Sequence, residues 1–237
     1  MSVDFLLKYA PRIIILFICQ PVHEWAHAWS AYKLGDDTAA YMGRKTLNPI
    51  AHLDPVGTLG ILFCGFGWGK PVPVNPAKFD RKHTMRKGMA ITAAAGPLSN
   101  LVMALLATIL YKFIGGAYVA SAVPSGTPNE TLGWLTTIAY YIVVLNIGLG
   151  VFNLIPVQPL DGSKIFAYFA GDRLNAKLSN YQQIITFVVL GLLIFSDFLN
   201  KPMALLNRGF FIIMNLLTFW VDPIVKAVFH IQALPLF

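Results

Sequence analysis

Apolar residues occur in five long runs along the chain, separated by shorter polar segments. The runs cover residues 12–33, 89–114, 132–155, 184–199 and 209–230. A helix needs about 20 predominantly apolar residues to cross the hydrocarbon core of a bilayer, and each run is close to that length. The pattern therefore predicts an all-α polytopic membrane protein with about five transmembrane helices in a single membrane domain, residues 1–237.

A shorter apolar stretch between the first two runs has a different character. Val56 to Trp68 contains four glycines and is bounded by Pro55 and Pro71. Valines and prolines then alternate in Gly67 to Pro76, a pattern that disfavours a helix and permits at most an edge strand. We expect a small membrane-associated β-hairpin or re-entrant segment here.

Composition and charge agree with a membrane location. The 237 residues are 56% hydrophobic and only 12% charged, outside the usual range of soluble domains. When the five spans are drawn, thirteen of the 18 lysines and arginines fall on one side and five on the other. The positive-inside rule then predicts a multi-pass protein of the cell membrane with its N-terminus outside. Because topology accounts for the net charge of +7, it does not indicate nucleic-acid binding.

The first apolar run contains two histidines and a glutamate in the order His23-Glu24-Trp25-Ala26-His27. Positions i and i+4 share one face of a helix, so the two imidazoles can bind one zinc ion. Glu24 is offset by about 100° around the helix, where its carboxylate can reach a water on the metal. Ionisable groups inside a membrane helix are costly, and a functional role is their default interpretation.

A catalytic zinc ion usually has three protein ligands, and Asp161 is the best candidate for the third. With the N-terminus outside, the first and third spans both run inward. His23, His27 and Asp161 therefore reach the same depth, toward the cytoplasmic side. Pro156 and Pro159 cannot continue a helical hydrogen-bond ladder, so we expect unwound backbone around Asp161. Such backbone is tolerated at membrane depth beside protein or a water-filled cavity, which would also supply water for hydrolysis.

On these motifs the chain resembles the site-2 proteases, a family of intramembrane zinc metalloproteases. The matching elements are the H-E-x-x-H of His23 to His27, the N-x-x-P-x-x-x-L-D-G of Asn153 to Gly162, and Gly96-Pro97-Leu98-Ser99-Asn100. The resemblance covers a three-span catalytic core, residues 10–170, followed by two C-terminal transmembrane helices in 171–237. It is closest to the short form without a PDZ or CBS domain.

The resemblance implies a role for each matching residue. Glu24 would be the general base, and His23, His27 and Asp161 would bind one zinc ion per chain. Asn100 and Asn153 would line the site, where an amide can bind substrate or stabilise an oxyanion. Interhelical hydrogen bonding is the alternative for both asparagines. His52 is a weaker candidate for substrate handling, because the turn in which it lies is explained by its prolines and capping residues.

The predicted function is hydrolysis of peptide bonds within or near transmembrane segments of membrane proteins. The expected partners are a transmembrane protein or peptide substrate and the lipid bilayer, without nucleic acid, and the sequence leaves a homo-oligomer open. An edge strand in Gly67 to Pro76 could pair with the extended backbone of such a substrate. The competing hypothesis is a zinc-binding membrane transporter or metal sensor, for which Glu24 would have no evident use.

Overall fold

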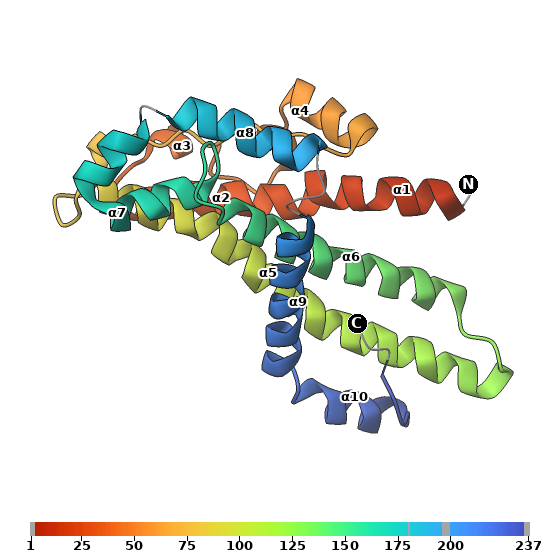
Figure 1. The fold of residues 1–237 in the computed structure, drawn as a ribbon. Helices are drawn as coiled ribbons and strands as arrows, with labels where there is room; N and C mark the ends of the chain where they lie inside the picture. The colour runs from red at the N-terminus through yellow and green to blue at the C-terminus, as the bar shows by residue number, and fades with distance from the viewer. Residues whose placement is uncertain (1–2, 180, 196–199, 235–237) are drawn as a thin grey trace.

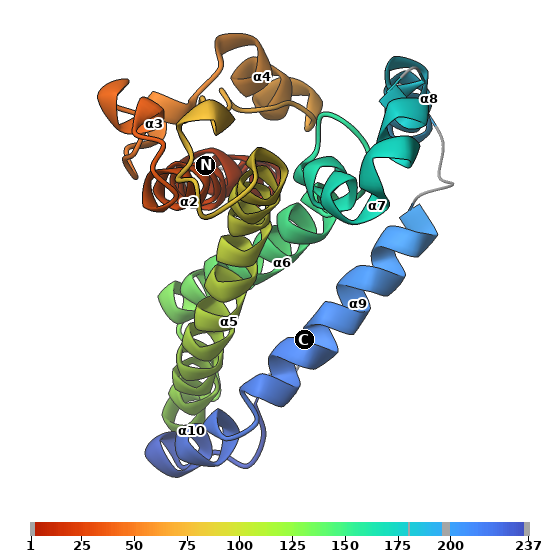
Figure 2. The same cartoon turned by 90° about the vertical axis from the view of Figure 1, so that its left-hand side faces the viewer.

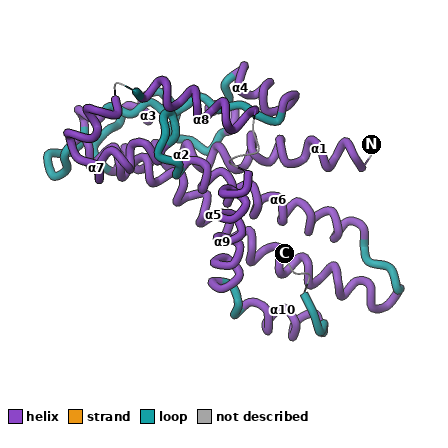
Figure 3. The backbone as a smooth tube through the Cα atoms, in the orientation of Figure 1, coloured by secondary structure: helices purple, strands orange, loops and turns teal. Residues whose placement is uncertain are grey.

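The computed structural model describes residues 3–179, 181–195 and 200–234. Within these residues the chain consists of helices and loops, without a β-strand (Figure 3). The α-helices are α1 (Val3–Ile14), α2 (Gln20–Lys33), α3 (Thr38–Tyr41), α4 (Pro55–Leu59), α5 (Met85–Ser125), α6 (Glu130–Asn153), α7 (Asp161–Ser179), α8 (Gln182–Phe195), α9 (Asn200–Leu217) and α10 (Val221–Phe229). The shorter elements are the π-helices η1 (Ile15–Cys19) and η3 (Gly60–Cys64) and the 3₁₀-helices η2 (Pro49–His52) and η4 (Pro76–Lys78).

The first predicted span is helical throughout, but it is not one regular α-helix. Residues 3–33 form α1, the π-helical turn η1 and α2 in direct succession. In the π-helical turn the Gln20 N–H bonds the Ile15 carbonyl, and Pro21 follows with no N–H to donate. The hydrogen-bond ladder is therefore irregular up to two residues before the histidine pair begins, and π-helical turns of this kind are frequent at functional sites.

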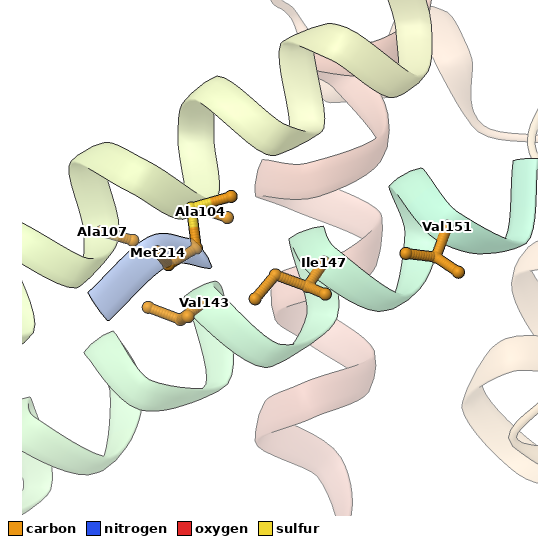
Figure 4. Close-up of a cluster of buried hydrophobic side chains, with 6 residues drawn as sticks. All are labelled: Ala104, Ala107, Val143, Ile147, Val151 and Met214. Atoms are coloured by element: carbon orange, nitrogen blue, oxygen red, sulfur yellow. The ribbon is translucent and has the colours of Figure 1, made fainter. Parts of the chain in front are cut away.

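Helices α5 and α6 form a long antiparallel pair, and α2, α7, α9 and α10 pack on it (Figure 1). Thr84 and Asn129 cap their N-termini by accepting hydrogen bonds from the Lys87 and Leu132 N–H groups. One face of α6 meets α5 and α9 in a cluster of buried apolar side chains, drawn in Figure 4: Ala104, Ala107, Val143, Ile147, Val151 and Met214. The small alanines on α5 let the helix backbones approach closely, as is common between membrane helices.

The C-terminal region differs from the two predicted spans. The fourth apolar run is represented by α8, and its residues 196–199 lie outside the described residues. The fifth run, 209–230, is divided between α9 and α10, because the chain bends by 65° between Leu217 and Val221. Helix α9 runs to α10, which packs on the C-terminal part of α5 (Figure 2).

By length and composition, two described helices could cross a membrane, Met85–Pro124 and Glu130–Asn153, or three if the bent α9–α10 pair counts as one span. The prediction of about five transmembrane helices is confirmed only to that extent. The first run does not qualify by itself, because η1 divides it into shorter helices.

The glycine-rich stretch forms a helical hairpin; of the two forms predicted for it, the β-hairpin is not confirmed, and a re-entrant segment stays a prediction. Helices α4 and η3 run to Gly65, whose positive φ of 77° turns the chain back along them. A Cβ atom on Gly57 would lie 2.0 Å from the Trp68 carbonyl oxygen, so only glycine permits this close approach. The following segment, residues 66–75, is irregular and has no strand partner among the described residues, because Pro71 and Pro73 supply no backbone donors.

Helices α2, α5 and α7 meet at one end of the α5–α6 pair, and the hairpin formed by α4 and η3 lies beside α1 (Figures 1 and 2). Helix α6 ends at Asn153, and residues 154–160 form the irregular segment that the prolines predicted. Asp161 then begins α7. The fold in this way brings residues from distant parts of the chain to the N-terminal part of α5.

Candidate metal centre

Two histidines of α2 and the first residue of α7 meet in the interior. The Oδ2 atom of Asp161 lies 3.2 Å from His23 Nε2 and 3.0 Å from His27 Nε2. The two Nε2 atoms are 3.0 Å apart, and one ligand atom from each residue lies within 4.8 Å of the others. All three side chains are buried. The sequence-predicted trio is therefore assembled in one place.

The hydrogen bonds behind the histidines show which ring atoms face this centre. His27 Nδ1 lies 2.7 Å from the Thr92 carbonyl oxygen, which can only accept, so Nδ1 carries the proton. His23 Nδ1 lies 2.6 Å from the side-chain oxygen of Asn100, which also accepts. In the neutral imidazoles both Nε2 atoms therefore present lone pairs toward the Asp161 carboxylate. Three acceptor atoms at these distances repel one another unless a cation lies between them.

The donor set fits zinc. Two imidazole nitrogens and a carboxylate oxygen are ligands that catalytic zinc sites use, with a further position left for water or substrate. Hydrogen bonds from the opposite ring nitrogens, as His23 and His27 make, are the usual support of metal-binding histidines. The residues that could hold a metal are thus His23, His27 and Asp161.

Helix α5 approaches the histidines closely at Gly96. A Cβ atom at this position would lie 2.4 Å from His27 Nε2 and 2.6 Å from His23 Cε1, inside van der Waals contact. Glycine is therefore required for α5 to reach both rings. This contact explains, on steric grounds, why the first residue of the G-P-x-x-N element is glycine.

Glu24 faces a cavity of about 340 Å³ beside the trio. Its Oε2 atom accepts a hydrogen bond of 2.9 Å from the backbone N–H of Val72. Residues of α2, α5 and α7, the end of α6 and the segment Gly67–Val74 line the cavity. The carboxylate predicted as general base and the three metal-binding side chains thus border the same space.

Buried polar groups fasten the segment that carries Val72. Arg44, itself 6% exposed, donates to the Lys70 carbonyl at 2.7 Å. Asp36 is completely buried and accepts from the Asn75 N–H at 2.6 Å. Burial lowers the pKa of Arg44, and the nearby Glu24 carboxylate acts in the opposite direction. The two buried charges hold the segment on either side of Val72.

Three further residues were predicted near the site, and the structure gives each a different position. Asn153 lines the cavity, and its amide donates to the Leu149 carbonyl at 2.9 Å. Asn100 is completely buried behind His23 and contacts that ring. His52 is also buried; its Nε2 lies 2.8 Å from the Thr46 carbonyl, and its own carbonyl accepts from the Lys70 N–H.

Four contributors were not predicted from the sequence: the Thr92 carbonyl, Asn146, the Val72 N–H and Arg44. Asn146 had a usable signal, because it is an amide in an otherwise apolar span, where polar side chains usually pair. Backbone groups such as the Thr92 carbonyl and the Val72 N–H have no signature in the residue type. Arg44 resembled the other basic residues of its loop.

Comparison with known proteins places this geometry in a family. The profile of Peptidase family M50 matches residues 11–196. The Putative zinc metalloprotease YwhC of Bacillus subtilis (strain 168) is 36% identical over 223 residues, which cover 92% of this chain and 96% of the relative. The Putative zinc metalloprotease Rip2 of Mycolicibacterium smegmatis is 29% identical over 143 residues, 60% of this chain and 50% of the relative. No solved structure matches this chain.

The matched region contains the whole candidate centre, from the histidine pair on α2 to the aspartate that begins α7. The match to YwhC extends over nearly the full length of both chains. The chain therefore belongs to Peptidase family M50, the family of the site-2 proteases.

Proposed function

We propose that this protein is an intramembrane zinc metalloprotease that hydrolyses peptide bonds within or near transmembrane segments of membrane proteins. The observation that carries the proposal is the meeting of the three acceptor atoms from His23, His27 and Asp161 at 3.0–3.2 Å, with both Nδ1 protons directed away. The name of the relative YwhC, a zinc metalloprotease, supports zinc as the cation.

In the proposed reaction Glu24 moves protons. Zinc, when bound, supplies Lewis acidity that lowers the pKa of water and polarises a carbonyl oxygen. Glu24 takes the proton of the attacking water and later delivers it to the leaving amine. Asn153, which lines the same cavity, can donate its second amide hydrogen to the substrate carbonyl. A transport function gains no support, since a carboxylate facing the cavity beside the ligands is not needed for it.

The substrate would bind in an extended conformation along residues 66–75. These residues are irregular and line the cavity next to Glu24. A transmembrane helix protects its backbone within its own hydrogen bonds, so cleavage requires the substrate to unwind and expose a carbonyl. Pairing with an extended segment provides substitute backbone hydrogen bonds in that state.

The proposal is tested with a flexible model transmembrane substrate and purified protein in detergent. Glu24→Gln should retain zinc and lose cleavage by about 1,000-fold, because the amide cannot accept the proton. Chelator treatment of wild-type protein should remove both zinc and cleavage. Cleavage by Glu24→Gln at the wild-type rate would contradict the proposed mechanism, and His23→Ala with full zinc content would contradict the ligand set.

We also propose that the chain crosses the cell membrane five times with its N-terminus outside and the metal centre toward the cytoplasm. Helices α5 and α6 are long and apolar enough to support two of these spans. The exposed residues Lys82 and Pro128 lie before and after α5, and therefore on opposite sides of the membrane in this topology. In a Cys64→Ser background, an impermeant maleimide should label Pro128→Cys in whole cells and Lys82→Cys only after lysis. The reverse labelling pattern would show that the protein has the opposite orientation in the membrane.

A further inference from the structure

The two histidines are oriented in different ways. His27 Nδ1 meets a backbone carbonyl, that of Thr92, and a carbonyl has no donor form. His23 Nδ1 meets the side-chain amide of Asn100, which has an oxygen at one end and an NH₂ group at the other. The group that orients the Asn100 amide therefore determines which ring nitrogen of His23 carries the proton.

A chain of buried hydrogen bonds provides that orientation. Asn100 Nδ2 donates to Asn146 Oδ1 at 2.8 Å and to the Cys19 carbonyl at 3.3 Å. Asn146 Nδ2 in turn donates to the Ile142 carbonyl at 2.8 Å and to Cys19 Sγ at 3.3 Å. The side chains of Asn100, Asn146 and Cys19 are completely buried. The Ile142 backbone carbonyl can only accept a hydrogen bond, so it fixes which way the Asn146 amide points, and the Asn146 amide in turn fixes the Asn100 amide.

We propose that Asn146 is a positioning residue that acts through Asn100 to keep the His23 proton on Nδ1 and its Nε2 lone pair directed at the metal. The inference rests on the proposed role of His23 as a zinc ligand. If the Asn100 amide were turned over, its NH₂ group would face His23 Nδ1. The ring would then carry its proton on Nε2, and this nitrogen could not bind zinc.

The turned-over amide is disfavoured while Asn146 is present. Asn100 Oδ1 would then face Asn146 Oδ1 and the Cys19 carbonyl, and the two amide oxygens would be left without donors in a buried site. Replacing Asn146 with leucine removes one of the two acceptors that hold the Asn100 NH₂ group. The supporting residues of metal-binding histidines commonly alter metal affinity by about 10-fold to 100-fold when they are changed.

The alternative is that Asn146 only joins helices, and a double-variant cycle separates the two roles. Asn100→Asp offers a carboxylate oxygen to His23 Nδ1 whichever way it turns, so nothing remains for Asn146 to orient. The inference predicts that Asn146→Leu weakens zinc binding about 10-fold to 100-fold in the wild-type background. In the Asn100→Asp background it should cause no loss. A purely structural role predicts the same loss in both backgrounds.

The measurement is zinc affinity by competition with a chelator on purified protein in detergent, with thermal stability recorded for each variant. Thr108→Val is the matched control, because Thr108 is also completely buried in a long helix, but bonds only the Ala104 carbonyl of its own turn. The control should bind zinc as the wild type does. Wild-type affinity in Asn146→Leu, or an equal loss in both backgrounds, would overturn the inference.

Two further variants keep the test decisive. His23→Ala reports on the ligand set itself: if it binds zinc normally, the proposed function fails, whereas zinc loss in His23→Ala with none in Asn146→Leu overturns only the role of Asn146. If Asn146→Leu does not fold, Asn146→Ala replaces it. It also removes the acceptor for Asn100 Nδ2, so the same loss of zinc affinity is expected in the wild-type background and none in the Asn100→Asp background; an equal loss in both would contradict the inference.

Discussion

The two faces of α2 hold their functional groups by different means. On one face, His23 and His27 are fixed by one side chain and one carbonyl from α5, a long helix with a buried interface. On the other, Glu24 is fixed by the backbone N–H of Val72, in an irregular segment that Arg44 and Asp36 attach to the protein. The proposed metal-binding side is part of the helical core, and the proposed proton-transfer side is bounded by a loop.

This difference shows where a substrate can be admitted. Displacing α5 would open the α5–α6 interface and separate the metal-binding residues. Displacing residues 66–75 would break the bonds of the segment to Glu24, Arg44 and Asp36, but it would leave the α5–α6 interface and the candidate ligands in place. The loop side of α2 is therefore the side from which an extended peptide would approach Glu24.

Gly96→Ala should cause the largest loss of cleavage, because it disturbs the packing of α5 against the two histidines. The new Cβ would lie 2.4 Å from His27 Nε2, so α5 or the rings must move. A displacement near 1 Å in a catalytic centre can cost about 100-fold in rate, and we expect at least that loss of cleavage together with weaker zinc binding. Gly148→Ala is the control, since its Cβ would meet nothing within 4 Å. Equal zinc affinity in the two variants would contradict the steric role of Gly96.

Val72→Pro should come next, because it removes the donor to Glu24 from the loop side. A hydrogen bond to a charged group contributes about 1.5 to 3 kcal/mol, so cleavage should fall about 10-fold to 100-fold. Zinc content should not change, since no metal-binding residue contacts the Val72 N–H. Val72→Ala, which keeps the N–H, should cleave at close to the wild-type rate. Similar rates in the proline and alanine variants would show that this hydrogen bond is not used.

Arg44→Met should have a smaller effect of the same kind. It removes the donor to the Lys70 carbonyl while leaving Asp36 and its bond to Asn75 in place. We expect cleavage to fall by roughly 5-fold, less than the full loss of a charge-assisted hydrogen bond, because the segment stays attached elsewhere. The neighbouring Lys45, which lies over the Tyr32 ring, provides the control Lys45→Met. A loss of zinc in Arg44→Met would mean that the two sides of α2 are not independent.

Asp37→Asn should have the smallest effect, since it changes an exposed pair away from both faces. The hydrogen bond from Lys78 holds the pKa of Asp37 below its ordinary value of 3.8. Any stabilisation is therefore present above that value and is lost as the pH falls through the lowered pKa. Exposed ion pairs contribute little, so the thermal midpoints of wild type and variant should differ by less than about 2 °C at pH 7. This difference should vanish in strong acid, and a loss of cleavage would place Asp37 nearer the site than the fold does.

Much of the candidate site follows from local patterns in the sequence. The i, i+4 spacing of His23 and His27 places both rings on one helix face, whatever surrounds them. Pro156 and Pro159 both lack the N–H that continues a helical hydrogen-bond ladder, so an interruption before Asp161 was predictable. The long apolar runs likewise predicted α5 and α6, because periodicity and length are properties of a segment by itself.

Other features depend on which segments pack together, and no local pattern contains that information. The bend between α9 and α10 lies inside an apolar run that would also be compatible with one straight helix. By its sequence, the segment after Gly65 was compatible with an edge strand. Only the packing decided that no strand of the described chain lies beside it.

The residue types and their spacing by themselves determined which residues are the candidate ligands and the candidate general base, and where the apolar helices lie, because these depend on side-chain chemistry within a few turns of one chain segment. Only the tertiary structure decided that Asn100 lies behind His23, that Asn146 orients it and that Val72 donates to Glu24. These contacts join residues 46 to 77 positions apart. Which of several polar groups meet at such separations is set by the close packing of α2, α5 and α6, since only a satisfied arrangement is stable once water is excluded.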